Sequence, residues 1–128
     1  MKQGLIYIFI LFLGNFPTFE GIQKNPNIIL GDWVSSTGIR TVHVYQERGK
    51  YKAVIIRSNN AKEVGRLILW DLIYDSKVGL WNSGKIQLPD MEHSAECYVE
   101  ADGNDVLKIT GYHGWRVFGK TEHYVRVQ

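Results

Sequence analysis

The chain has 128 residues, of which 45% are hydrophobic and 22% are charged, with a formal net charge of +2. This composition is typical of one soluble domain and excludes two domains, a polytopic membrane protein and a disordered chain. The small net charge also argues against nucleic acid as a partner, because nucleic-acid-binding proteins carry strongly basic surfaces.

The N-terminus has the pattern of an export signal. Lys2 precedes nine consecutive apolar residues at positions 5–13, and the sequence Gly-Asn-Phe-Pro at 14–17 breaks any helix. Nine residues are too few to span a bilayer, which takes about 20. We therefore predict a signal peptide over residues 1–21, a periplasmic or secreted protein, and no transmembrane segment in the mature chain. The alternative is a buried N-terminal strand or a short uncleaved anchor.

Beyond residue 28, short apolar runs are separated by turn residues, and several runs alternate with period two. Ala95, Cys97 and Val99, for example, alternate with Glu96 and Tyr98, as in a half-buried strand. The run at residues 66–74 is nearly continuously apolar and could be read as a helix, but its length and flanks favour a strand buried on both sides. The pattern predicts eight strands, at residues 30–34, 41–46, 51–57, 66–74, 80–88, 94–101, 106–112 and 117–127.

Short turns between these strands favour an antiparallel meander. Eight such strands can bury one face and remove their exposed edges by closing on themselves. We therefore predict an all-β fold over residues 28–128, a single small up-and-down antiparallel β-barrel, with an open sandwich as the alternative. The interior of an eight-stranded barrel is wide enough to be filled by side chains or to hold one small ligand.

Four motifs, in order, resemble a known family. Gly-Asp-Trp stands at 31–33, Trp-Asn-Ser-Gly-Lys-Ile at 81–86, Leu-Lys-Ile-Thr-Gly-Tyr at 107–112, and Phe-Gly-Lys-Thr-Glu-His-Tyr-Val-Arg-Val at 118–127. Their order and spacing resemble the exported bacterial proteins of domain of unknown function 2147. The resemblance implies a lipocalin-like fold and export, but no reaction. The family usually has glycine where Ser83 stands and tryptophan where Tyr124 stands.

The opening motif is also similar to the broader lipocalin pattern, in which a tryptophan on the first strand packs beneath an arginine near the end of the last. Trp33 and Arg126 occupy the matching positions. Barrel closure would place these strands side by side, and a guanidinium over an indole face contributes about 0.5–2 kcal/mol. The resemblance thus implies a structural latch between these two residues. True lipocalins are longer, so we expect a shorter barrel and a smaller cavity.

The aromatic residues are the strongest hint of a ligand site. Beyond the predicted signal, Phe118 is the only phenylalanine, so almost every other ring carries a polar group. Such rings suit the mouth of a barrel, where one edge is apolar and the other wet. We predict that five of them line a ligand site: Tyr45, Trp70, Trp81, Tyr98 and Tyr112. The alternative is that these rings fill the core of a small barrel.

No motif for catalysis or metal binding stands out. The four histidines lack paired ligand spacing, and no Gly-x-Ser-x-Gly run presents a serine nucleophile. Cys97, the only cysteine, lies within a predicted strand, so we expect a small buried hydrophobe, with an intermolecular disulfide as the alternative. We expect no enzymatic activity, no metal and no cofactor.

These observations predict a non-catalytic binder of a small apolar or amphipathic ligand at the barrel mouth. The prediction rests on analogy at the level of the fold. The alternative is an envelope-associated interaction or structural protein with a filled barrel and a functional outer face.

Overall fold

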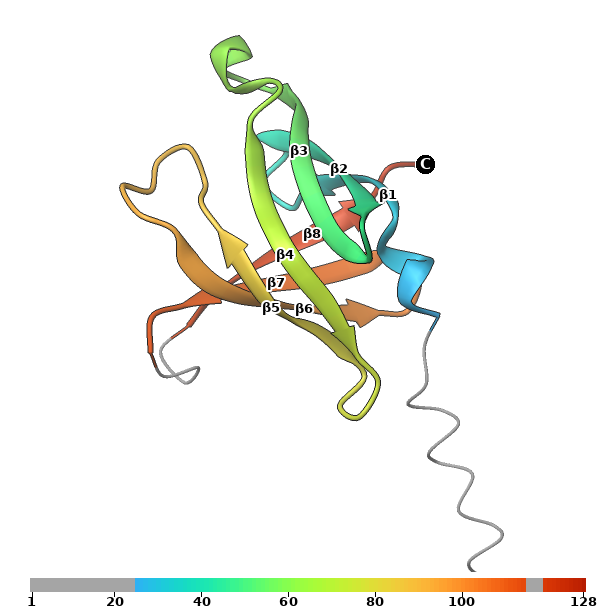
Figure 1. Ribbon diagram of the computed structural model, residues 1–128. Helices are drawn as coiled ribbons and strands as arrows, with labels where there is room; N and C mark the ends of the chain where they lie inside the picture. Colours follow the sequence, from blue (N-terminus) through green and yellow to red (C-terminus); the bar gives the residue numbers. More distant parts are fainter. Residues whose placement is uncertain (1–24, 115–118) are drawn as a thin grey trace, which may run out of the picture.

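The fold is a closed barrel of eight antiparallel strands in simple meander order (Figure 1). The structure, a computed structural model, describes residues 25–114 and 119–128, so the predicted signal peptide at 1–21 lies outside the described residues. The predicted all-β, up-and-down barrel is confirmed. Its strands are β1 (Gly31–Ser35), β2 (Arg40–Glu47), β3 (Lys50–Ser58), β4 (Leu67–Asp75), β5 (Leu80–Ile86), β6 (Ala95–Asp102), β7 (Val106–Tyr112) and β8 (Lys120–Arg126).

Pairing between the first and last strands closes the ring. β1 lies antiparallel to β8, with Trp33 opposite Arg126 and Ser35 opposite Tyr124. Hydrogen bonds from the Val127 N–H to the Asp32 carbonyl and from the Ser36 N–H to the His123 carbonyl extend this pairing at 3.0 and 2.9 Å. The two strands that would be the edges of an open sheet, β1 and β8, are thereby paired with each other, as expected of a closed barrel.

Two predicted strand ends need correction. β5 ends at Ile86 instead of 88, because the chain turns there and the Met91 N–H bonds to the Leu88 carbonyl at 2.9 Å, next to Pro89, which has no N–H. β8 begins at Lys120, whereas the prediction placed its start at 117; residues 117 and 118 lie outside the described part of the chain.

Side chains at every second position along the strands point inward and fill the barrel. In β6, Ala95, Cys97, Val99 and Ala101 are buried while the residues between them are more exposed, which follows the period-two pattern of the sequence. The largest fully buried side chains are Trp33, Trp81 and Tyr124, together with smaller aliphatic residues. Cys97 is buried among them, as expected of a small hydrophobe.

A short 3₁₀ turn, η1 (Pro26–Ile29), covers one end of the barrel (Figure 1). The indole N–H groups of Trp33 and Trp81 donate to backbone carbonyls of η1 at 2.9 and 3.1 Å, and the Tyr51 hydroxyl donates to the Asn27 side chain at 2.8 Å. We call this the closed end. The sequence prediction missed η1, because four residues are too short to show periodicity. Among the described residues, no helix is long and apolar enough to cross a bilayer.

The pairing of β4 with β5 is interrupted at its centre. Asp71 in β4 and Ser83 in β5 have φ angles of 60° and 62°, in the left-handed region that non-glycine residues rarely adopt. Ser83 stands where the resembled family usually has glycine, which adopts this region without strain. The neighbouring Gly84 has a different role: a Cβ there would lie 2.8 Å from a Leu72 methyl and 2.9 Å from the Cys97 sulfur.

Candidate functional site

Within residues 25–114 and 119–128, no such turn covers the opposite end of the barrel, which is called the open end here. The β1–β2, β3–β4 and β5–β6 connections lie at this end, together with the end of β7 and the start of β8, while η1 and the other turns lie at the closed end (Figure 1). The arrangement follows from the meander, since successive connections alternate between the two ends. Any interior site that a solute can enter therefore lies at the open end.

A cavity of about 520 Å³ lies at the open end. Its walls come from positions near the strand ends and from three of the connections. The apolar part of the wall is formed by Ile39, Ile86, Leu88, Met91, Ala95 and Ile109. The charged part consists of Arg40, Asp90, Lys120 and Glu122. We call this space the open-end cavity.

Arg40 is fixed at the edge of the cavity by an ion pair. Its Nε donates to Glu63 Oε1 at 3.0 Å, and the same oxygen accepts the Ser58 hydroxyl at 2.7 Å. Burial by itself lowers the pKa of Arg40, but the hydrogen bond and charge of Glu63 outweigh it and raise the pKa overall. The pKa of Glu63 is lowered by its bonds to Arg40 and Ser58. The Arg40 charge is therefore already balanced before any ligand arrives.

Glu122 connects the cavity to the buried part of β8. The hydroxyl of buried Tyr124 donates to Glu122 Oε1 at 3.3 Å. Burial, together with the nearby Glu122 charge, raises the pKa of Tyr124 well above its ordinary value. Tyr124 is therefore neutral and donates at any physiological pH. The two basic and two acidic side chains of the wall give it no net charge.

Trp33 and Arg126 meet at the closed end. The guanidinium carbon of Arg126 lies 4.2 Å from the centroid of the Trp33 ring. The same guanidinium donates to the carbonyls of Leu30 and Asn104 at 3.0 and 2.8 Å, and to that of Ile28. The structure thus brings together the two residues predicted to form a latch, and Arg126 also holds the start of the chain.

The comparisons with known proteins agree with this fold. A family model described as "Uncharacterized protein conserved in bacteria (DUF2147)" matches residues 31–126. The chain belongs to the DUF2147 family. A similar solved structure is that of protein HP1028 from Helicobacter pylori, described as belonging to the lipocalin family. It is 21% identical, covering 78% of this chain and 83% of its own, with a TM-score of 0.64. At that identity the likeness shows a lipocalin-like fold alone. No curated protein matches this chain.

In this DUF2147 chain the aromatic residues predicted to line a site are scattered. Tyr112 lines the open-end cavity, and its ring centroid lies 6.0 Å from that of Tyr98. Trp81 is buried and bonded to η1 at the closed end, away from the cavity. Tyr45, Trp70 and Tyr98 are partly exposed and do not line the cavity. Tyr45 and Tyr98 each alternate with buried inward residues, so they occupy outward positions.

Most of the cavity wall of this DUF2147 protein was not predicted. Ile86, Ala95 and Ile109 were assigned to strands but not to a site. One sequence signal could have found them: Ala95 and Gly111 are small residues at inward positions near the open ends of β6 and β7. Small inward side chains leave space that larger ones would fill. The inward positions of Ala95 and Gly111 therefore indicate the cavity better than the number of aromatic residues in the chain does.

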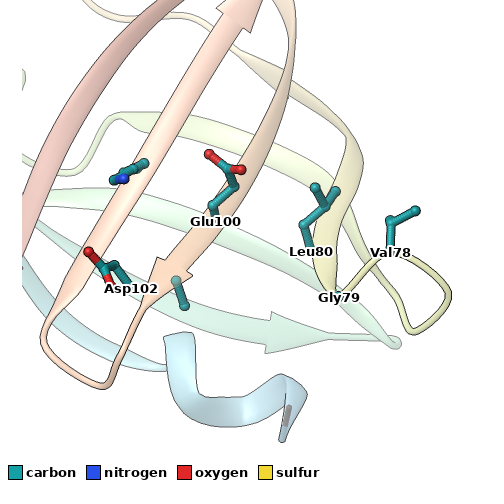
Figure 2. A pocket seen from close by; sticks show the side chains of 7 residues that line it. Val78, Gly79, Leu80, Glu100 and Asp102 are labelled. Carbon is teal, nitrogen blue, oxygen red and sulfur yellow. The ribbon is translucent and has the colours of Figure 1, made fainter. Parts of the chain in front are cut away.

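A second hollow lies on the DUF2147 barrel near the closed end, with a volume of about 320 Å³. Figure 2 shows Val78, Gly79 and Leu80 from the β4–β5 region beside Glu100 and Asp102 of β6. It is a shallow surface hollow rather than an interior site. Within the described ranges, no group of three or more His, Cys, Asp or Glu side chains could hold a metal ion.

Proposed function

We propose that this protein binds one small apolar or amphipathic molecule in the open-end cavity. The observation that carries the proposal is a cavity of about 520 Å³ in a barrel that is otherwise packed. Ligand sites in proteins occupy about 300–1,000 Å³ and combine an apolar wall with a few polar groups. The open-end cavity meets both conditions. The lipocalin description of the structural neighbour adds an analogy at the level of the fold.

The lining suggests how such a molecule would lie. An apolar body would contact Ile86, Ala95 and Ile109 on neighbouring strands, while a polar group would reach Lys120 or Glu122 at the edge. Because Arg40 is already paired with Glu63, we propose that the apolar wall supplies most of the affinity and the charged residues fix the orientation.

We further propose that binding is not followed by catalysis. The nucleophilic candidate Cys97 is fully buried, and burial raises the pKa of its thiol to about 12. A thiol with that pKa carries almost no thiolate at neutral pH, and the thiolate is the nucleophile. Tyr124 is likewise held in its neutral form by burial.

A probe-binding experiment tests the ligand site. The fluorescence of cis-parinaric acid should rise on binding to the wild-type protein. Ala95→Leu fills the cavity from β6, whereas Ala101→Leu adds the same volume at an inward position near the other end of β6. We expect Ala95→Leu to weaken binding at least tenfold and Ala101→Leu to change it less than twofold, with urea unfolding showing that both are folded. No binding by wild type, or equal binding by the two variants, would overturn the proposal.

We also propose that the protein is exported to the periplasm or secreted. Support comes from the apolar segment at 5–13 and from membership of a family conserved in bacteria. Intact-mass measurement of the protein from fractionated cells tests this. We expect a periplasmic or secreted species that has lost its N-terminus between residues 14 and 22. An intact Met1 in the cytoplasmic or membrane fraction would contradict it.

The alternative function, an envelope-associated interaction protein, is favoured by one separate observation. The segment between β3 and β4, beside the open end, exposes both basic and apolar side chains: Ile56, Arg57, Lys62, Val64, Arg66 and Leu67. This surface does not compete with ligand binding, because none of these six residues lines the open-end cavity.

A further inference from the structure

The segment that joins β3 to β4 extends beyond the other strand ends at the open end (Figure 1). We call residues 56–67 the β3–β4 arm. It includes the end of β3, the short turn η2 (Ala61–Glu63) and the first residue of β4. Its position makes it the first part of the open end to meet a surface that approaches from that side.

The arm displays apolar side chains that the barrel does not bury. Ile56, Val64 and Leu67 are 38, 49 and 40% exposed. Ile39 of the β1–β2 turn is 42% exposed, and its carbonyl accepts the Asn59 N–H at 3.1 Å, which places it next to the arm. Single exposed aliphatic residues are ordinary, but a group of them at one projecting edge marks an interaction surface.

The arm is also basic. Arg57, Lys62 and Arg66 are exposed, and in the part of the chain that the structure describes none of them forms an ion pair within 4.0 Å. The only acidic residue of the arm, Glu63, is already paired with Arg40. By contrast, two of the three cations of the hairpin between β2 and β3 form ion pairs, Lys50 with Asp71 at 3.6 Å and Lys52 with Glu47 at 2.7 Å. Residues 56–67 therefore carry three basic side chains against one acidic side chain, a net charge of +2.

The arm is held in a defined shape. The Asn60 side chain caps η2 by accepting the Lys62 N–H at 3.1 Å, and the Gly65 N–H bonds to the Ile55 carbonyl at 2.8 Å. The ion pair between Glu63 and Arg40 ties η2 to the start of β2 at 3.0 Å. Because these bonds fix the backbone, docking would order the side chains of the arm but would not have to order its backbone.

We propose that the β3–β4 arm docks on the surface of a membrane containing anionic phospholipids. The three free cations match lipid phosphates, and the apolar side chains match the boundary between headgroups and acyl chains, which is the combination that binds proteins to membrane interfaces. The acidic residues Asp90 and Glu92 belong to the neighbouring β5–β6 connection, whose Leu88, Pro89 and Met91 line a small hollow together with Arg66 and Leu67 of the arm. Because the arm projects beyond the other strand ends here, its cations meet the bilayer first and the open-end cavity faces the lipid (Figure 1).

Vesicle co-sedimentation tests the electrostatic part. The full-length protein is mixed with vesicles of equal parts phosphatidylglycerol and phosphatidylcholine at low salt, with phosphatidylcholine alone for comparison. Each cation near an anionic surface contributes about fivefold to binding. We expect the double variant Lys62→Gln/Arg66→Gln to bind about 25-fold more weakly, consistent with two such contributions. Lys77→Gln/Lys108→Gln loses the same charge near the closed end and should change binding less than about threefold.

A second pair of variants tests the apolar part. Val64→Ser removes an exposed valine from the arm, and Val78→Ser removes one from the β4–β5 turn near the closed end. We expect Val64→Ser to weaken vesicle binding several-fold and Val78→Ser to leave it unchanged. All variants carry the same N-terminus, so the apolar residues 5–13 contribute equally to each measurement.

The outcomes separate docking from ligand binding. Ala95→Leu should bind vesicles like wild type, because no residue of the arm lines the cavity. Equal vesicle binding by the arm variants and their closed-end controls would overturn the proposal. So would equal binding to phosphatidylglycerol-containing and phosphatidylcholine vesicles at low salt. If vesicles fail to bind while cis-parinaric acid still does, membrane docking is refuted alone, and a protein with an acidic surface is the better match for the arm.

Discussion

Replacing Arg126 by methionine should destabilise the barrel strongly. The variant keeps most of the aliphatic stem but loses the contact with the Trp33 ring and the bonds to the carbonyls of Ile28, Leu30 and Asn104. A hydrogen bond from a charged donor contributes about 1.5–3 kcal/mol, and a cation over an indole about 0.5–2 kcal/mol. The low ends of these ranges sum to about 5 kcal/mol, and because the carbonyls lie at the barrel end, water replaces part of that loss.

We therefore expect Arg126→Met to lower the free energy of unfolding by about 3–4 kcal/mol. With a urea m-value of about 1–1.5 kcal/mol/M for a domain of this size, the unfolding midpoint falls by about 2–4 M. The nearby Asp105 contributes little, since its side chain is 66% exposed and lies 3.9 Å from Arg126. Arg57→Met, at an exposed position on β3, is the matched control and should stay within about 0.5 kcal/mol of wild type.

A double-mutant cycle with Trp33→Leu isolates the ring contact. Trp33→Leu retains apolar bulk but removes the indole, so the coupling energy between the two substitutions should be about 1 kcal/mol. A loss below about 1 kcal/mol for Arg126→Met would refute the reasoning. A coupling energy of zero would show that Arg126 acts only through its hydrogen bonds.

Four further predictions follow from local geometry. Ser83→Gly should raise stability by about 0.5–1 kcal/mol, because glycine relieves the left-handed strain at a modest entropic cost; urea unfolding measures this. Gly84→Ala should lower it by about 1–3 kcal/mol, since the new Cβ meets the Cys97 sulfur in a packed interior. The pKa of Glu63 is lowered by its bonds to Arg40 and Ser58, so the stability it supplies is present above the ordinary value of 4.5 and is lost as pH falls through the lower folded value. Glu63→Gln should therefore flatten the acid limb of a stability–pH curve below pH 4.5. Cys97 should resist iodoacetamide at pH 8 in the native state and react at once in urea, as judged by mass.

Each of these has a control or a contrary outcome. Ser76→Gly, in the β4–β5 turn, should not stabilise the protein, because Ser76 lacks a positive φ. Unchanged stability for Gly84→Ala would mean that the neighbouring side chains move aside freely. An unchanged acid limb for Glu63→Gln would show that the ion pair is not linked to folding. Rapid labelling of native Cys97 would reveal an opening of the barrel.

The fold could be predicted because its signals are local and repeated. The alternation around Cys97 fixes both the strand and its inward face, and turn residues mark where each strand ends. The resemblance supplied the contact between Trp33 and Arg126, which lie far apart in the sequence. Neither source indicated η1, whose four residues fold only because Trp33, Trp81 and Arg126 bond to them.

The cavity was harder to predict, because it is defined by missing volume. The choice of Tyr45 and Tyr98 followed aromatic content, although the alternation already places Tyr98 outward, between Cys97 and Val99. The wall instead comprises aliphatic residues and the small residues Ala95 and Gly111. Pairing between strands decides which small residues become neighbours, and one sequence does not show how much space they leave.

The bonds from Arg126 to η1 also determine when the barrel can be completed. Arg126 reaches the carbonyls of Ile28 and Leu30, 98 and 96 residues earlier in the chain. Contacts across such separations form only after residue 126 has been synthesised, and proteins dominated by them fold slowly. A nascent chain of this protein therefore has neither the pairing of β1 with β8 nor the covered closed end until β8 has left the ribosome.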